Sequence, residues 1–147
     1  MQEPNLRLFG DVHSKLCRVL SSLSSMLSAS GCYLISRSGL ELAASVAEEP
    51  SDRSALCSLA AGTLAATESL GQMVGEHQFR RIFQRGRRRS VLLCPVGPMA
   101  LLLVVLNGSQ QDRISRRELD RVILLLQDLL ERDNLRGGPP SPGERRK

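Results

Sequence analysis

Aromatic residues are scarce in this chain of 147 residues, which has no tryptophan, one tyrosine and three phenylalanines. A core can still form, because 41% of the residues are hydrophobic, but leucine, valine, isoleucine and alanine have to build it. The length is that of one domain. The scarcity of aromatic rings also argues against a protein that binds single-stranded nucleic acid, since such proteins stack bases on aromatic side chains.

The chain also lacks the motifs of a catalytic, metal or nucleotide site. Its cysteines are far apart, have no Cys-x-x-Cys spacing and lie in apolar runs, which is typical of small core residues in a reducing compartment. His13 and His77 have no ligand or nucleophile motif nearby. No glycine-rich phosphate loop is present. We therefore expect no metal, no cofactor and no enzymatic activity of the chain's own.

Long apolar runs are missing as well. The first eleven residues contain no apolar core of a signal peptide, and the longest apolar run, 99–106, is too short to span a bilayer. We expect a cytoplasmic protein.

The hydrophobic periodicity predicts an α+β fold. Helical spacing is found over 11–30, over 51–75 and from 115 to about 135, and strand patterns over 31–37, 40–45, 76–85, 89–95 and 98–106. The order α-β-β-α-β-β-β-α predicts a five-stranded antiparallel sheet, with the two terminal helices on one face and the middle helix on the other. The segment 76–85 also suits a helix, and we interpret it as an edge strand. The domain is predicted over 1–135, followed by a disordered basic tail over 136–147.

The middle helix has an unusual distribution of side chains. On a helical wheel, larger residues share one side and small residues a second, broad side, while Glu68 is the one formal charge after Arg53. We predict that Leu56, Leu59, Thr63, Leu70 and Val74 face the core. We predict that the small side, formed by Ala55, Ser58, Ala61, Gly62, Ala65, Ala66 and Ser69, meets a partner. The alternative is a central helix covered entirely by its own chain.

The positive charge, +5 in all, is concentrated in arginines at 80, 81, 85 and 87–89 and in the last three residues. Such a cluster can contact the phosphates of nucleic acid or of an anionic membrane. It can also steer an acidic protein partner towards the chain. A third interpretation is a solvated edge strand whose charges prevent aggregation.

Several segments resemble the roadblock/dynein light chain family over about 6–135. The matching residues lie in the hairpin, the middle helix, the segment after it and the last strand. They are Leu34-Ile35, Ser38-Gly39-Leu40, Leu59-Ala60-Ala61-Gly62, Ala65-Ala66, Gly75-Glu76, Phe79, Phe83, Gly86 and 99–106. Among family members, the bacterial regulators of a small Ras-like GTPase are the most similar. The arginines at 80, 81 and 87–89 depart from the family pattern.

The resemblance implies a homodimer in which the middle helix and the strand 76–85 pair with their copies. It implies a platform that binds a small Ras-like GTPase and stimulates GTP hydrolysis without inserting an arginine finger, in the control of cell polarity or motility. The residues placed in GTPase binding are Ser58, Ala61, Gly62, Ala65 and Ser69, and those placed in dimerisation are Ala66, Phe79, Arg81 and Phe83. A scaffold that joins proteins without changing GTP turnover would use the same platform.

Overall fold

The computed structural model describes residues 10–108 and 115–137, with side chains as far as 133. Three helices and five strands follow one another in the predicted order. They are α1 (Gly10–Leu27), β1 (Gly31–Ser36), β2 (Glu41–Val46), α2 (Arg53–Met73), β3 (Ile82–Arg85), β4 (Arg89–Val96), β5 (Ala100–Asn107) and α3 (Arg116–Gly137).

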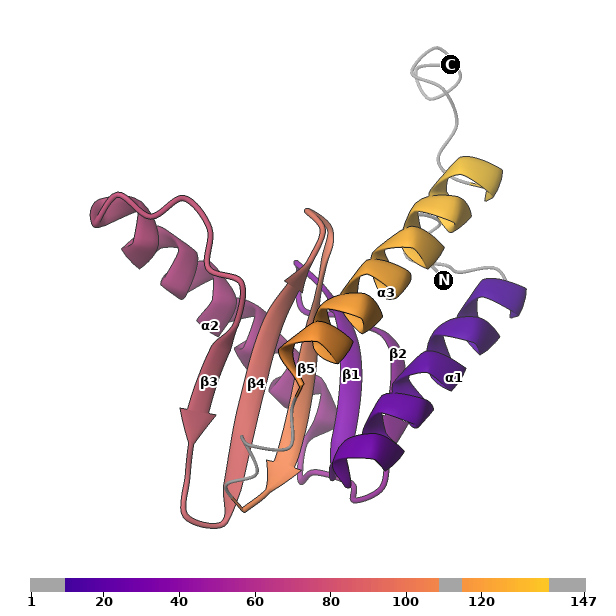
Figure 1. Cartoon of the computed structure of the whole chain (residues 1–147), viewed down its shortest axis with the longest axis horizontal. Coiled ribbons are helices and arrows are strands. Elements are labelled where there is room, and N and C mark those ends of the chain that lie inside the picture. Colours follow the sequence, from indigo (N-terminus) through magenta and orange to yellow (C-terminus); the bar gives the residue numbers. More distant parts are fainter. Residues whose placement is uncertain (1–9, 109–114, 138–147) are drawn as a thin grey trace.

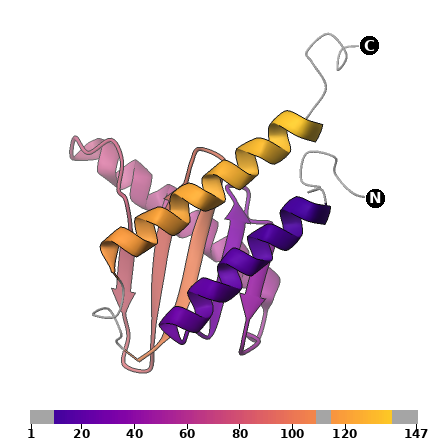
Figure 2. The same ribbon diagram turned by 45° about the vertical axis from the view of Figure 1, so that its right-hand side comes forward.

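The strands form one antiparallel sheet in the order β2-β1-β5-β4-β3, so β2 and β3 are its edges. In Figures 1 and 2, α1 and α3 lie side by side across one face of the sheet and α2 lies on the other. This arrangement confirms the predicted fold, including the edge position of β3. β4 and β5 are interior strands with a helix layer on both sides, which explains why they are hydrophobic along most of their length.

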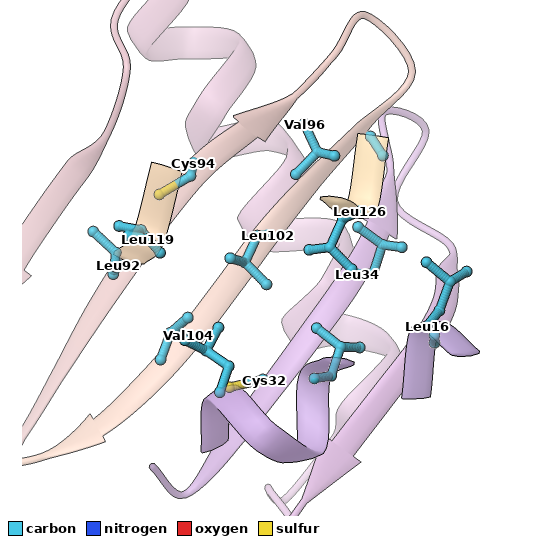
Figure 3. Packing of buried hydrophobic residues seen from close by; sticks show 14 of the residues in the cluster. Leu16, Cys32, Leu34, Leu92, Cys94, Val96, Leu102, Val104, Leu119 and Leu126 are labelled. Carbon is cyan, nitrogen blue, oxygen red and sulfur yellow. The ribbon is translucent and has the colours of Figure 1, made fainter. Parts of the chain in front are cut away.

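Alternating residues of the strands divide the core into two halves. On the α1 and α3 side, Cys32, Leu34, Leu102 and Val104 pack under the helices, as Figure 3 shows together with Leu119 and Leu126 of α3. On the α2 side, the residues between them, such as Tyr33, Ile35, Leu101 and Leu103, form a smaller cluster. Cys32, Cys57 and Cys94 are buried, as expected for small core residues, whereas Cys17 is half-buried.

Local signals set most of the element boundaries. The side chain of Asp52 accepts a hydrogen bond from the Ala55 amide at 3.0 Å and caps α2, and Ser115 accepts one from the Glu118 amide at 3.3 Å at the start of α3. The strand predicted over 76–85 is shorter than expected, since residues before Ile82 form a loop. α3 continues to Gly137 and so includes the first two residues of the predicted tail, whereas the rest of that tail lies outside the described residues.

Candidate protein-interaction surface on the middle helix

Helix α2 packs on the sheet through small residues. Its buried residues are Cys57, Ala60, Ala61, Leu64 and Gly71. Small side chains let the helix axis come close to the strands, and Leu64 supplies the largest side chain in the contact. Ala61, which we placed on the partner-facing side, is only 8% exposed, so that placement was wrong.

The outward side of α2 carries the larger apolar residues. Leu59 is 69% exposed, Leu70 61% and Met73 86%, and Val74, just after the helix, is also exposed. The prediction that Leu59, Leu70 and Val74 face the core was therefore wrong, and these residues add to the candidate surface. The signal that could have found them is the absence of charge around the helix, because an outer face normally carries charged residues.

No exposed residue of α2, which the structure describes from end to end, carries a charge. We define the outer face of α2 by these residues: Ser54, Ser58, Leu59, Gly62, Ala65, Ala66, Ser69, Leu70, Gln72 and Met73. Exposed apolar patches that lack charge are characteristic of protein-protein contacts.

The outer face divides lengthwise into two halves on the helical wheel. One half has only small side chains, Ser58, Gly62, Ala65 and Ser69. A methyl group built on Gly62 would meet no atom within 4 Å, so the backbone there is open to close approach. The other half has Leu59, Ala66, Leu70 and Met73. The four exposed residues that we assigned to GTPase binding thus lie together, and Ala66, assigned to dimerisation, lies in the bulky half.

The two charged residues of α2 are held by partners beside the sheet. Arg53 bonds Glu41 at 2.6 Å and Glu49 at 2.9 Å, with its guanidinium 5.8 Å from the centre of the Tyr33 ring. Burial raises the pKa of the Tyr33 hydroxyl, and the Arg53 charge partly opposes this shift. Glu68 accepts two bonds from Arg37, at 2.9 and 3.0 Å. These contacts keep both charges away from the outer face.

After α2 the chain folds back over the end of the helix. A methyl group on Gly71 would lie 2.7 Å from the Phe79 ring and 3.0 Å from the Glu76 carbonyl oxygen, so the loop needs glycine there. The Glu76 amide donates to the Gly71 carbonyl at 2.8 Å. In Figures 1 and 2 this end of α2 projects past the sheet at its β3 edge. The outer face of α2 and the open edge of β3 are therefore neighbours.

The other residues assigned to dimerisation make contacts within their own chain and remain partly exposed. Phe79 covers Gly71. Arg81 donates to Asp120 of α3 at 3.1 Å. Phe83 packs against the core under α1 and α3.

Within the described ranges, no group of three or more His, Cys, Asp or Glu side chains is arranged to hold a metal ion. None of the helices in that part of the chain is long and apolar enough to cross a membrane.

Comparison with known proteins agrees with the geometry. The family model for the Roadblock/LC7 domain matches residues 16–107. The structure is similar to that of the gliding protein MglB from Thermus thermophilus, with 28% identity, a TM-score of 0.80, and coverage of 89% of this chain and 99% of that one. A structure described as MglB with a tetrameric arrangement has 26% identity, a TM-score of 0.80, and coverage of 90% and 99%.

MglB from Myxococcus xanthus shares the fold at 22% identity, with a TM-score of 0.77 and coverage of 86% of this chain and 95% of that one. A comparison with curated protein sequences found no match. Since the family model spans more than half of the residues, the chain belongs to the Roadblock/LC7 domain family.

Proposed function

We propose that the chain is a homodimeric, non-enzymatic regulator that binds a small Ras-like GTPase of the MglA type and stimulates its GTP hydrolysis, in the control of cell polarity or motility. The observation that carries the proposal is the outer face of α2, where exposed leucine and methionine side chains lie next to a strip of small residues and no charge interrupts them. The similarity to MglB supports a regulatory role.

The two halves of the outer face suit two different contacts. The bulky half at Leu59, Leu70 and Met73 provides apolar area for a second copy of α2. The edge of β3 carries backbone groups that a second β3 can pair with, which would join two sheets. The small half at Ser58, Gly62, Ala65 and Ser69 then remains accessible, as a shallow platform that lets a GTPase segment approach the helix backbone.

Stimulation would act through the partner's own residues. The platform supplies no arginine, since its exposed residues are uncharged. As the resemblance implies, the platform would hold the catalytic segments of the GTPase in their productive arrangement, so that binding energy is used for positioning.

The test is single-turnover GTP hydrolysis by the Ras-like GTPase encoded nearest to this gene, with and without this protein. Ala65→Arg is expected to remove the stimulation and to weaken binding at least about 30-fold, about 2 kcal/mol, because a long charged side chain blocks close approach. Ala65 is exposed, so the free energy of unfolding of the variant should lie within about 0.5 kcal/mol of the wild-type value.

Ser22→Arg on the exposed side of α1 is the matched control and should keep full stimulation. Binding of the GTP form without acceleration would identify a scaffold and contradict the activating role. Unfolding of Ala65→Arg would show that this face is covered within the chain.

A further inference from the structure

Five exposed arginines lie on the hairpin between β3 and β4 and at the beginning of α3. Arg85, Arg87 and Arg88 belong to the hairpin, and Arg116 and Arg117 open α3. We call these five residues the basic corner. All five are exposed, and none has a carboxylate within 4.0 Å in the part of the chain that the structure describes. The proposed function leaves them without a role.

Packing places the start of α3 above β4, the strand that follows the hairpin. Arg81, just before β3, bonds Asp120 in the first turns of α3 at 3.1 Å. Leu119 packs against Leu92 and Cys94 of β4, as Figure 3 shows. The start of α3 therefore lies over β4, level with the end of β3 at which the strand begins, on the same face of the sheet as the side chain of Arg81.

The hairpin is held rigidly. The hydroxyl group of Ser90 accepts from the Gly86 amide at 3.4 Å and donates to the Gly108 carbonyl at 2.9 Å, and the Gly108 amide donates to the Arg88 carbonyl at 2.7 Å. A methyl group on Gly86 would lie 2.3 Å from the Arg89 carbonyl oxygen, so this turn requires glycine. The guanidinium groups thus project from a fixed backbone.

The neighbouring Arg89 has a structural role and differs in this respect from the arginines of the basic corner. It donates to Glu48 at 2.9 Å and to the Ser30 hydroxyl at 3.3 Å, and so ties β4 to the loop after β2. The bond to Arg89 lowers the pKa of the Glu48 carboxyl. The arginines of the basic corner make no such contact with a carboxylate among the described residues, so the stability of the fold does not account for them.

The position of Arg116 and Arg117 is unfavourable for the helix itself. The first turn of a helix has a partial positive charge from its free amide groups, which repels cations. Arg116 and Arg117 add two positive charges there, against the one carboxylate of Glu118 in the same turn. A negatively charged ligand would relieve the repulsion.

We propose that the basic corner docks the protein on a membrane surface that contains anionic phospholipids. Arginine binds phosphate oxygens in pairs through its planar group of donors. The five side chains are all cationic and exposed, which favours contact with phosphate groups at a surface over insertion into lipid.

In a dimer, both basic corners would lie on one side of the molecule, which favours a flat partner such as a membrane. This step rests on the proposed function. Arg81, just before β3, and Phe83 of β3 point to the α3 side of the sheet, and Arg85 shares their side by alternation. If two copies pair through β3, both basic corners lie on the face of the joined sheet that carries α1 and α3. The α2 platforms lie on the opposite face. A dimer resting on a membrane by its corners would present its platforms to a GTPase.

The test is co-sedimentation of the full chain with vesicles of phosphatidylcholine that contain about 30% phosphatidylserine, compared with phosphatidylcholine alone. We expect binding to the anionic vesicles only, with loss on raising the salt from about 50 mM to about 300 mM. Each arginine near the membrane surface strengthens vesicle binding roughly five-fold. The triple variant Arg85→Gln, Arg87→Gln and Arg88→Gln should therefore weaken binding on the order of 100-fold. Arg116→Gln with Arg117→Gln should weaken it roughly 25-fold.

Lys15→Gln with Arg18→Gln removes two exposed charges from α1 and is the matched control, with an expected loss below about five-fold. Ala65→Arg should bind vesicles normally, and the corner variants should stimulate GTP hydrolysis normally in solution, so failure of this proposal and failure of the proposed function are distinguishable. Absence of vesicle binding at low salt would overturn the proposal. So would tighter binding to duplex DNA with the same arginine dependence, which would indicate a nucleic-acid site.

Discussion

At the scale of single residues, Arg37 is notable because its side chain joins three parts of the fold. Its guanidinium bonds both carboxylate oxygens of Glu68 on α2 and also the carbonyl oxygens of Gly97 and Ala100, each at 3.2 Å. One side chain therefore fixes the middle of α2 against the turns at one end of the sheet. We expect this attachment to help set the orientation of the outer face.

Arg37→Lys is expected to lower the free energy of unfolding by about 1 kcal/mol, because lysine cannot make the paired bonds and the site is only half-buried. Urea denaturation measures the change. Arg132→Lys is the matched control, since its pair with Asp128 is more exposed, and it should change stability by less than about 0.3 kcal/mol. Equal effects of the two substitutions would show that Arg37 does not hold α2.

The four cysteines differ in their surroundings and should differ in reactivity. Burial raises the pKa of Cys32 and of Cys94 to about 12 and also raises the pKa of Cys57, so these thiols stay protonated and covered. Cys17 is half-buried on α1. We expect a thiol reagent at pH 8 to modify Cys17 quickly in the native protein and all four cysteines only after unfolding.

Cys17→Ser is the control and should abolish the fast reaction. The same burial predicts that stability falls as the pH rises from 9 towards 12, because the unfolded chain releases the protons of Cys32 and Cys94 first. Fast modification of Cys32 or Cys94 at pH 8 would contradict the burial described here.

At the scale of elements, helix α2 shows what the sequence reveals and what it leaves open. The spacing of apolar residues, Asp52 as a cap and the glycine at 75 located the helix correctly. The assignment of its faces was wrong for the large apolar residues Leu59, Leu70 and Val74, which were expected in the core, and for Ala61, which was expected at a partner. The other small residues assigned to GTPase binding are exposed, as that assignment requires. In the structure, close packing on the sheet selects Ala60 and Ala61, and the leucines at 59 and 70 face outward. The centre of a homodimer interface is also apolar and well packed, so hydrophobicity alone cannot distinguish such a surface from a core.

The sheet was easier to predict than its edge. β4 and β5 have long hydrophobic runs that only a central position can bury, and both were expected. The segment before Ile82 mixes polar residues with Phe79, and its loop form depends on a tertiary contact of Phe79 with Gly71 that no local pattern shows. The pairing of Arg81 with Asp120 and of Arg89 with Glu48 likewise depends on contacts distant in sequence. These pairs separate the structural arginines from those that have no carboxylate partner among the described residues.

At the scale of the whole molecule, the three surfaces have different characters. The outer face of α2 is apolar and uncharged, β3 has an open edge, and the basic corner is strongly positive. The first two are adjacent, and the corner faces the other side of the sheet. A two-fold pairing through α2 and β3 would bury the apolar half while leaving the small half and the corners accessible. Dimerisation is thus the assumption on which the geometry of both proposals depends.

Leu70→Glu with Met73→Glu tests this pairing, because it places two carboxylates in the bulky half of the outer face without touching the core. A charge buried without a partner is strongly unfavourable, so we expect the dissociation constant of the dimer to rise at least about 100-fold. Light scattering coupled to size exclusion measures the mass over a dilution series. Leu124→Glu with Leu125→Glu is the matched control, since these leucines are also exposed but lie on α3, and it should remain dimeric. If only the α3 variant dissociates, the copies meet through α3. The positions proposed for the platforms and the basic corners in the dimer would then be wrong. A wild-type chain that is monomeric at every concentration would refute the pairing.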